Sequence, residues 1–112
     1  MIFNESDLLE KVGGLEDLMV EMIEVFLADS RHAHDNVRRA IAGKDFVNLR
    51  ESAHAVKGAA LSLSAEDYLS VVCDLEKAGY DENPNLEDLA LNFDIAYEKL
   101  TNKFEEILES KK

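Results

Sequence analysis

The sequence predicts an all-α fold, and three observations support that prediction. Apolar residues recur in steps of three and four along most of the 112-residue chain, which is the spacing of a buried helical face. Only one proline is present, and the alternating apolar pattern of a half-buried strand is missing. Because short connections separate long amphipathic segments, we expect an up-down antiparallel four-helix bundle with a short additional helix at the N-terminus.

The first predicted helix is short and runs from about residue 6 to residue 12. Asn4 and Ser6 are both suitable capping residues for its start. Gly13 and Gly14 follow it directly, and such a pair ends a helix readily because glycine adopts positive φ angles.

A second, broad apolar face predicts a buried helix after the glycine pair. It consists of Leu15, Leu18, Met19, Met22, Ile23 and Phe26. Helical spacing then continues through residues 33–41 as far as Gly43. The pattern fits one bent helix and two separate helices equally well.

A third helix is expected from Phe46 to about Leu63, with Asp45 as its cap. Its buried stripe contains Phe46, Leu49, Ala53, Val56, Ala60 and Leu63.

The last two helices are expected on either side of the turn Asn83-Pro84-Asn85. Ser64 and Asp67 have the spacing of a capping box, so one helix is expected to start there and to run to Gly79. Asn85 is the expected cap of the final helix. The apolar seam of that helix contains Leu86, Leu89, Phe93, Tyr97, Leu100, Phe104 and Ile107.

His54 belongs to the third predicted helix but points away from its buried stripe. At about 100° per residue, its side chain lies roughly 130° from the centre of the stripe, so we expect a solvated imidazole. Gly58 lies one turn later and removes a side chain that would crowd the ring, and Lys57 adds a cation beside it. An exposed nucleophile with a clear approach and a nearby positive charge is suited to carrying a phosphoryl group. The competing interpretations are a plain surface histidine, a solvated lysine and a glycine kept for close helix packing.

Residues 53–65, AHAVKGAALSLSA, resemble the phosphorylation motif of histidine phosphotransfer (HPt) domains. The similarity extends upstream through GGLEDLMVEMIEVFLADS and VRRAIAGKDFVNLRESAH, and downstream through YLSVVCDLEKAG. Val56 stands where leucine is commoner, and Ala59 and Ala60 stand where serine is frequent. The resemblance covers essentially the whole chain, so residues 1–112 are interpreted as a single HPt domain.

The resemblance implies a phosphorelay carrier in two-component signalling. In that role His54 accepts a phosphoryl group through Nε2 from the aspartate of a response-regulator receiver domain and passes it to another receiver. Lys57 then stabilises charge on the phosphoryl oxygens, and Gly58 leaves room for the partner. The implied partners are receiver domains and a sensor histidine kinase. Mg²⁺ is expected in the receiver, whereas this chain is expected to have no cofactor of its own.

Three further residues are candidates for a docking rim around the histidine. Val47 and Leu61 both lie within roughly 20° of the His54 direction on a helical wheel. If neighbouring helices leave these side chains exposed to solvent, they form an apolar rim around the histidine. If neighbouring helices cover them, they are ordinary core residues. Arg50, one turn before His54, is the candidate polar edge of this rim.

Length and charge exclude several other classes of function. A chain of this size holds one core, and it has no Gly-rich phosphate loop, so autonomous kinase activity is not expected. The formal net charge of −12 argues against binding to nucleic acid or to an anionic membrane. No apolar run is long enough to span a bilayer. A cytoplasmic monomer is the expectation, consistent with the single cysteine, Cys73, which we interpret as a small core residue.

His32 and His34 form a His-x-His pair that suggests a metal site. Residues two apart on a helix diverge by about 200°, so these side chains are not expected to share an ion. Neither histidine is expected to have a functional role, and substitution of either is expected to be silent.

Two alternative functions are consistent with the same motif. The first is the histidine-containing input module of a chemotaxis-type kinase, which is phosphorylated in trans. The second is an adaptor that binds a receiver without accepting phosphate. The compact length from Met1 to the final lysines favours a free-standing relay protein over an excised domain. The joint presence of His54, Lys57 and Gly58 speaks against the adaptor.

Overall fold

A computed structural model of the chain describes residues 1–111, and all regular structure in this range is helical. Five helices follow one another: α1 (Glu5–Lys11), α2 (Glu16–Ala42), α3 (Phe46–Ser62), α4 (Glu66–Tyr80) and α5 (Glu87–Ser110). The predicted all-α bundle with a short N-terminal helix is therefore confirmed. The second element is one continuous helix, which settles the alternative that the sequence leaves open.

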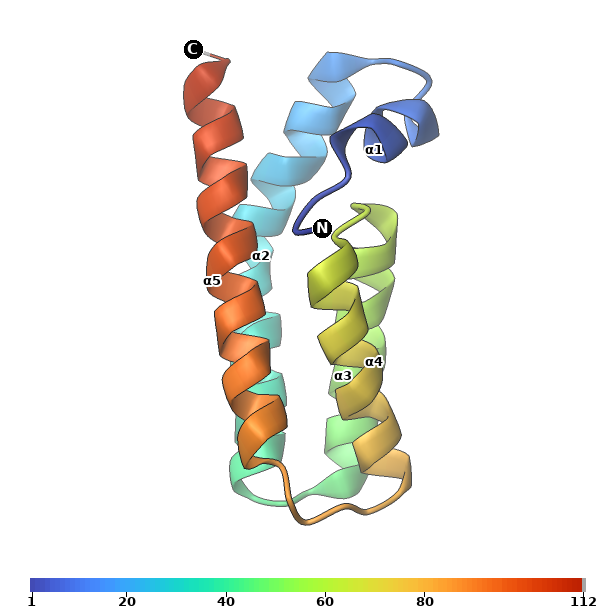
Figure 1. Cartoon of the computed structure of the whole chain (residues 1–112), viewed down its shortest axis with the longest axis vertical. Helices are drawn as coiled ribbons and strands as arrows, with labels where there is room; N and C mark the ends of the chain where they lie inside the picture. The colour runs from blue at the N-terminus through green and yellow to red at the C-terminus, as the bar shows by residue number, and fades with distance from the viewer. Residues whose placement is uncertain (112) are drawn as a thin grey trace.

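The four long helices form two pairs of unequal length. Figure 1 shows α2 and α5 rising above the hairpin of α3 and α4, and α1 lies across the upper end of that hairpin. The most extensive helix–helix contact in the bundle is between α3 and α4. This arrangement leaves one face of α3 without a covering helix.

The core lies between the helix pairs and is rich in aromatic side chains. Phe26 contacts Tyr68 and Phe104 edge-on, with ring centroids 6.3 and 5.5 Å apart. Met19, Ile23 and Phe26 of α2 are buried as predicted, but Leu15 and Leu18 are 61% and 40% exposed. The expectation that these two leucines belong to the core is wrong: Leu15 precedes the first turn of α2, and Leu18 lines an open groove between α2 and α3.

Two of the predicted helix caps are confirmed. The backbone N–H of Asp7 donates to Asn4 Oδ1, and the backbone N–H of Asn48 donates to Asp45 Oδ1, each at 3.1 Å. Gly13 and Gly14 adopt φ angles of +67° and +79° between α1 and α2, which only glycine takes readily.

The other two predicted caps are wrong. At the start of α4, Ala65 occupies the cap position without a side-chain hydrogen bond, while Asp67 accepts from the amino group of Met1 at 3.0 Å. At the start of α5, Leu86 occupies the cap position, again without a side-chain bond. Asn85 instead donates its N–H to Asn83 Oδ1 within the turn.

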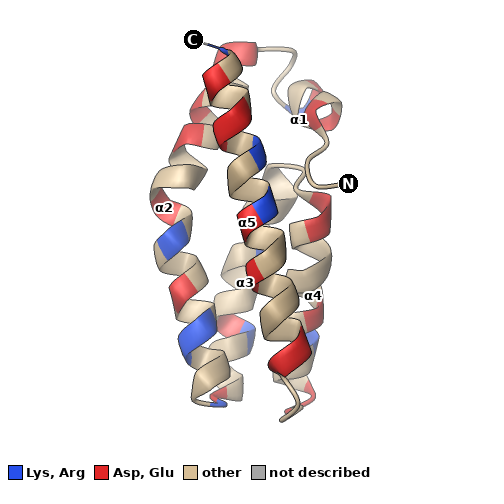
Figure 2. Ribbon diagram, turned by 60° about the vertical axis from the view of Figure 1, so that its left-hand side comes forward, with Lys and Arg blue, Asp and Glu red and all other residues tan. Residues whose placement is uncertain are grey.

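Charge is distributed unevenly along α2. Five acidic residues and no lysine or arginine occupy residues 16–30, whereas Arg31, Arg38 and Arg39 follow in the C-terminal half. Figure 2 shows these basic bands in the lower part of the helix. No helix within residues 1–111 combines the length and the apolar character needed to cross a membrane.

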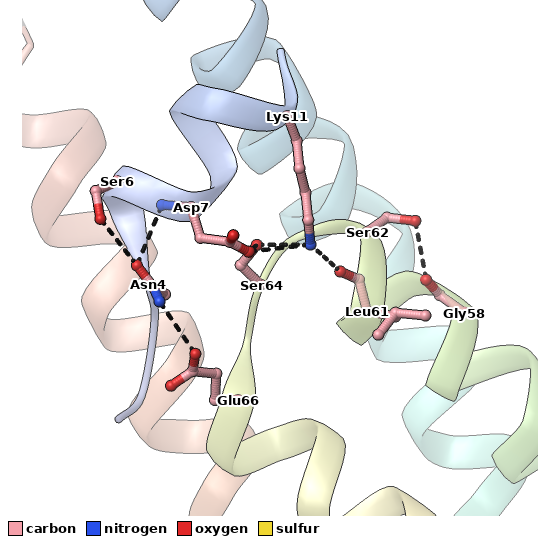
Figure 3. Close-up of polar contacts among 9 residues, drawn as sticks. All are labelled: Asn4, Ser6, Asp7, Lys11, Gly58, Leu61, Ser62, Ser64 and Glu66. Carbon is pink, nitrogen blue, oxygen red and sulfur yellow. Dashed lines mark hydrogen bonds and ion pairs between the residues drawn. The ribbon is translucent and has the colours of Figure 1, made fainter. Parts of the chain in front are cut away.

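Residues of α1 hold the turn between α3 and α4 in place. Lys11 Nζ donates to Leu61 O and to Ser64 Oγ, both at 2.9 Å, and the Ser64 hydroxyl donates to Asp7 Oδ2 at 2.6 Å (Figure 3). Hydrogen bonds from Ser64, the largest cause, and from Lys11, whose Nζ lies 3.2 Å from Asp7 Oδ2, hold the pKa of Asp7 below its usual value. The Ser64 hydroxyl bonds to Lys11 and Asp7 and therefore supports this anchor instead of a capping box.

Candidate functional site

His54 lies at the middle of the uncovered face of α3. Its side chain is 71% exposed, so the expected solvated imidazole is confirmed. The opposite face of the same helix is fully packed, with Leu49, Ala53 and Ala60 at 0% exposure. The apolar stripe therefore fixes the orientation of the helix, and the outward direction of the histidine follows from it.

Glu76 of α4 forms a hydrogen bond with His54 that the sequence analysis did not identify. Its Oε2 lies 2.7 Å from His54 Nδ1. Hydrogen bonds from Lys57 and His54 lower the pKa of Glu76, with the Lys57 contribution the largest. The carboxylate is therefore ionised at neutral pH and can only accept, so Nδ1 carries the ring proton. In the neutral ring, the lone pair is then on Nε2, which has no hydrogen-bond partner within residues 1–111.

Lys57 binds the second oxygen of the same carboxylate. Lys57 Nζ donates to Glu76 Oε1 at 2.7 Å, and this bond raises the pKa of the lysine. The three side chains form a chain from imidazole to carboxylate to ammonium, with Glu76 only 14% exposed at its centre. Glu76 becomes a neighbour of the ring only because α4 packs alongside α3.

Gly58 is not required for helix packing. A Cβ atom added to it would meet nothing within 4 Å. Gly79 on α4 is different, since a Cβ there would lie 3.0 Å from the Cβ and backbone N of Arg50. Close approach of α3 and α4 thus depends on Gly79, and the packing interpretation of Gly58 is excluded.

The candidate docking rim is open to solvent on its apolar side. Val47 is 52% exposed and Leu61 is 56% exposed, so the covered-core alternative is wrong for both. Arg50 is half-buried, and its guanidinium carbon lies 5.2 Å from the centroid of the exposed Tyr80 ring. This cation–π contact ties the polar edge of the rim to the end of α4.

An apolar groove runs beside the histidine between α2 and α3. Its volume is about 460 Å³, and it is lined by Leu18, Met22 and Val25 from α2 and by Ala55 and Ala59 from α3. Ala55 follows His54 in the chain, and Ala59 follows Gly58. The helical pattern does not predict this groove, because it places Leu18 and Met22 in the core.

The other two histidines occupy different environments. His32 is exposed, whereas the His34 side chain is 4% exposed and stacks against Phe93 and Tyr97 with ring centroids 4.2 Å apart in both cases. His34 Nε2 lies 2.8 Å from Asp94 Oδ1. Because the ring is part of the core, we expect substitution of His34 to lower stability, in place of the silent substitution that the sequence predicts. The described part of the chain contains no group of three or more His, Cys, Asp or Glu side chains with the geometry of a metal site.

Cys73 is exposed, which corrects its interpretation as a core residue. It lies on α4 one turn before Glu76, on the side that faces solvent near Lys57. The buried positions of α4 are instead Tyr68, Val72 and Leu75.

Comparisons with known proteins support one family. The family model described as the Hpt domain matches residues 21–110, which is well over half of the chain and includes His54, Lys57, Gly58 and Glu76. Neither the curated proteins nor the solved structures contain a significant match.

Proposed function

The chain belongs to the Hpt domain family, and from this premise we propose that it carries a phosphoryl group on Nε2 of His54 between receiver-domain aspartates. Members of this family are phosphotransfer carriers of two-component signalling and not kinases. The observation that carries the proposal is the bond between Nδ1 and Glu76, which leaves the lone pair on the exposed nitrogen.

The proposed transfer forms one bond and breaks one bond. The Nε2 lone pair of His54 attacks the phosphorus of an aspartyl phosphate, the P–N bond forms, and the bond between phosphorus and the aspartate oxygen breaks. The aspartate leaves as a carboxylate. No proton has to move, because Nδ1 already carries it, and the positive charge that develops on the ring is stabilised by Glu76 at 2.7 Å.

Lys57 supplies positive charge beside the path of the phosphoryl group. Its ammonium group is held on Glu76 before transfer, and its side chain is 31% exposed. We propose that it shares its hydrogen bonds with the phosphoryl oxygens as the group arrives. Mg²⁺ is proposed to be bound by the receiver, where it neutralises phosphoryl charge. The reaction runs in both directions, with its sense set by the partners.

Exposure around His54 supports the same role. Gly58 leaves open space one turn after the ring, and Val47 and Leu61 are exposed apolar side chains on the same face. Together with Arg50 they are the proposed first contacts of a receiver. A transient interface of this kind has a modest apolar centre with polar edges.

The test is transfer from a receiver domain that has been phosphorylated with labelled acetyl phosphate and freed of the reagent. We expect the label to move to this chain and to be labile in acid and stable in base, as a phosphoramidate is. Incubation with Mg²⁺ and labelled ATP alone is expected to give no label. Labelling from ATP alone contradicts the carrier function, and labelling only by an added kinase catalytic domain favours the kinase-input alternative.

A further inference from the structure

The groove between α2 and α3 has the size and the lining of a small-molecule site. Its volume of about 460 Å³ falls within the usual range of ligand pockets, about 300–1,000 Å³. Most of its lining side chains are apolar, and two of them, Leu18 and Val25, are 40% and 54% exposed. An apolar ligand body is favoured here, because it removes these side chains from water.

A buried polar group without a partner lies at the floor of the groove. Tyr68 of α4 lines the groove and is 1% exposed, and its hydroxyl forms no hydrogen bond within residues 1–111. In that range, His34 Nδ1 is the one side-chain nitrogen or oxygen that is both enclosed and without a partner. The Tyr68 oxygen is therefore not sealed in the core. It opens into the groove that the residue lines, where a ligand can bond to it.

The core fixes the position and the protonation state of this hydroxyl. The Tyr68 ring stacks on Phe93 with ring centroids 5.5 Å apart and meets Phe26 edge-on. Burial, the largest cause, raises the pKa of Tyr68, so the hydroxyl keeps its proton at neutral pH. It can donate one hydrogen bond and also accept. A ligand that supplies a partner recovers the free energy that an unpaired buried hydroxyl costs.

The charged side chains that line the groove are both acidic. Glu21 and Asp29 are exposed, and within residues 1–111 neither forms an ion pair or hydrogen bond. Residues 16–30, which supply the α2 edge of the groove, contain no lysine or arginine to neutralise them. The edge of the groove therefore favours a cation over a neutral ligand, and a neutral ligand over an anion.

We propose that the groove binds a small amphipathic amine, whose apolar ring carries a hydrogen-bonding group for Tyr68 and whose protonated amino group faces Glu21 or Asp29. The proposal goes beyond the proposed function and does not depend on it, because binding needs neither a receiver nor a phosphoryl group. A nucleotide or another anionic metabolite is disfavoured, since no lysine or arginine lines the groove.

The test measures binding of tryptamine, which has an indole N–H at one end and an amino group at the other. The chain contains no tryptophan, so indole fluorescence reports on the probe alone. We expect saturable one-to-one binding with a Kd on the order of 0.1–1 mM, as suits a ligand of about a dozen non-hydrogen atoms. Skatole, the neutral methyl analogue, is expected to bind about three- to fivefold more weakly, because it lacks the ion pair. Indolepropionate, which is anionic, is expected to bind more weakly than skatole.

One substitution tests the contact at the floor of the groove. Tyr68→Phe keeps the stacked ring and removes only the hydroxyl, so we expect it to weaken tryptamine binding about fivefold and to leave the melting temperature nearly unchanged. The benzothiophene analogue of tryptamine, which has sulfur in place of the N–H, is expected to bind the variant and the wild type nearly equally.

A second set of variants tests the acidic edge. The double variant Glu21→Gln and Asp29→Asn is expected to remove the preference for tryptamine over skatole, because both carboxylates are neutralised without a change of size. Glu24→Gln is the matched control, since this exposed α2 residue does not line the groove. The control is expected to keep the preference.

The outcomes are distinct from those that test the carrier function. Binding of tryptamine that does not saturate, or binding that Tyr68→Phe and the double variant leave unchanged, overturns the groove as the binding site. Tightest binding of indolepropionate overturns the amine as the ligand class. In each case the role of His54 is unaffected, because it is measured separately by transfer from a labelled receiver.

Discussion

His54 and His34 are both paired with a carboxylate, yet the two imidazoles have opposite surroundings. At the α3 face, Nδ1 is bound to Glu76 and Nε2 is free in solvent, with the side chain 71% exposed. In the core, Nε2 is bound to Asp94, and Nδ1 is buried without a partner within residues 1–111. A carboxylate partner therefore does not by itself mark a functional histidine. What distinguishes His54 is that its second nitrogen can reach another molecule.

The largest expected effect is that variants of the two histidines have opposite consequences for phosphoryl acceptance and for stability. His54→Gln is expected to abolish phosphoryl acceptance while leaving the melting temperature nearly unchanged, because the ring makes no core contact. His34→Gln is expected to keep acceptance and to lower the free energy of unfolding by about 1–3 kcal/mol, because a stacked, hydrogen-bonded ring is lost from the core. Labelling and thermal melts of both variants test the contrast. Label that persists in the His54 variant would place the acceptor elsewhere.

Substitution of Glu76 tests whether the carboxylate positions the ring. Glu76→Ala is expected to slow transfer by at least about tenfold, because the proton is no longer held on Nδ1 and the charge of the phosphorylated ring is no longer stabilised. The ¹⁵N shifts of the His54 ring are expected to report a mixture of tautomers in the variant and one tautomer in the wild type. Asp94→Ala is the matched control, since it removes the carboxylate partner of the other histidine. Slow transfer with an unchanged tautomer would contradict the positioning role.

Lys57→Ala is expected to slow transfer on the order of tenfold, the scale of one electrostatic contact to a transferring phosphoryl group. The lysine is partly exposed and lies at the surface, so helical content and thermal stability are expected to stay nearly constant. Lys77→Ala, an exposed lysine on α4, provides the control for loss of one positive charge. Equal transfer rates for the two variants would show that Lys57 has no specific role in transfer.

Much of the bundle and the central histidine follow from the sequence because both depend on helical periodicity. The stripe from Phe46 to Leu63 is sufficient to direct His54 outward, and the structure agrees. Periodicity within one helix does not show which residues meet across two helices. Glu76 is 22 positions from His54 and becomes its neighbour only when α4 packs on α3. His34 was misjudged for a related reason, since its burial depends on two aromatic side chains of α5.

Acidic pH is expected to weaken the fold through His34. Burial, the largest cause, lowers the pKa of this ring from its usual 6.5. Between the lowered value and 6.5 the unfolded chain therefore binds more protons than the folded chain, so the free energy of unfolding rises with pH in this window. The stabilisation is complete above pH 6.5 and is lost as the pH falls below it, by up to about 1.4 kcal/mol per pH unit.

Chemical denaturation at pH 7.5 and pH 5.0 measures this dependence. The control is His34→Phe, which keeps an aromatic ring between Phe93 and Tyr97 but cannot bind a proton. We expect the wild type to lose more stability than the variant on acidification. Equal losses would assign the pH dependence to groups other than this buried histidine.

The smallest expected effect concerns the two glycines that border the exposed and packed sides of the site. Gly58→Ala is expected to raise the free energy of unfolding by up to about 1 kcal/mol, because the added methyl group meets nothing within 4 Å and alanine favours the helix. Gly79→Ala is expected to lower it, since the new Cβ would lie 3.0 Å from the backbone of Arg50. Thermal melts of the two variants measure these opposite shifts.

Gly58→Gln then separates stability from transfer at the exposed position. Its side chain leans towards the preceding turn of α3 and therefore over the imidazole of His54. We expect the melting temperature to hold or rise while transfer from a phosphorylated receiver slows, because the partner's aspartyl phosphate has to reach Nε2 through the space that the side chain now occupies. Gly58→Ala is expected to slow transfer much less, since a single methyl group does not extend to the ring. A Gly58→Gln variant that transfers at the wild-type rate would show that the open space beside His54 is not part of the partner's approach.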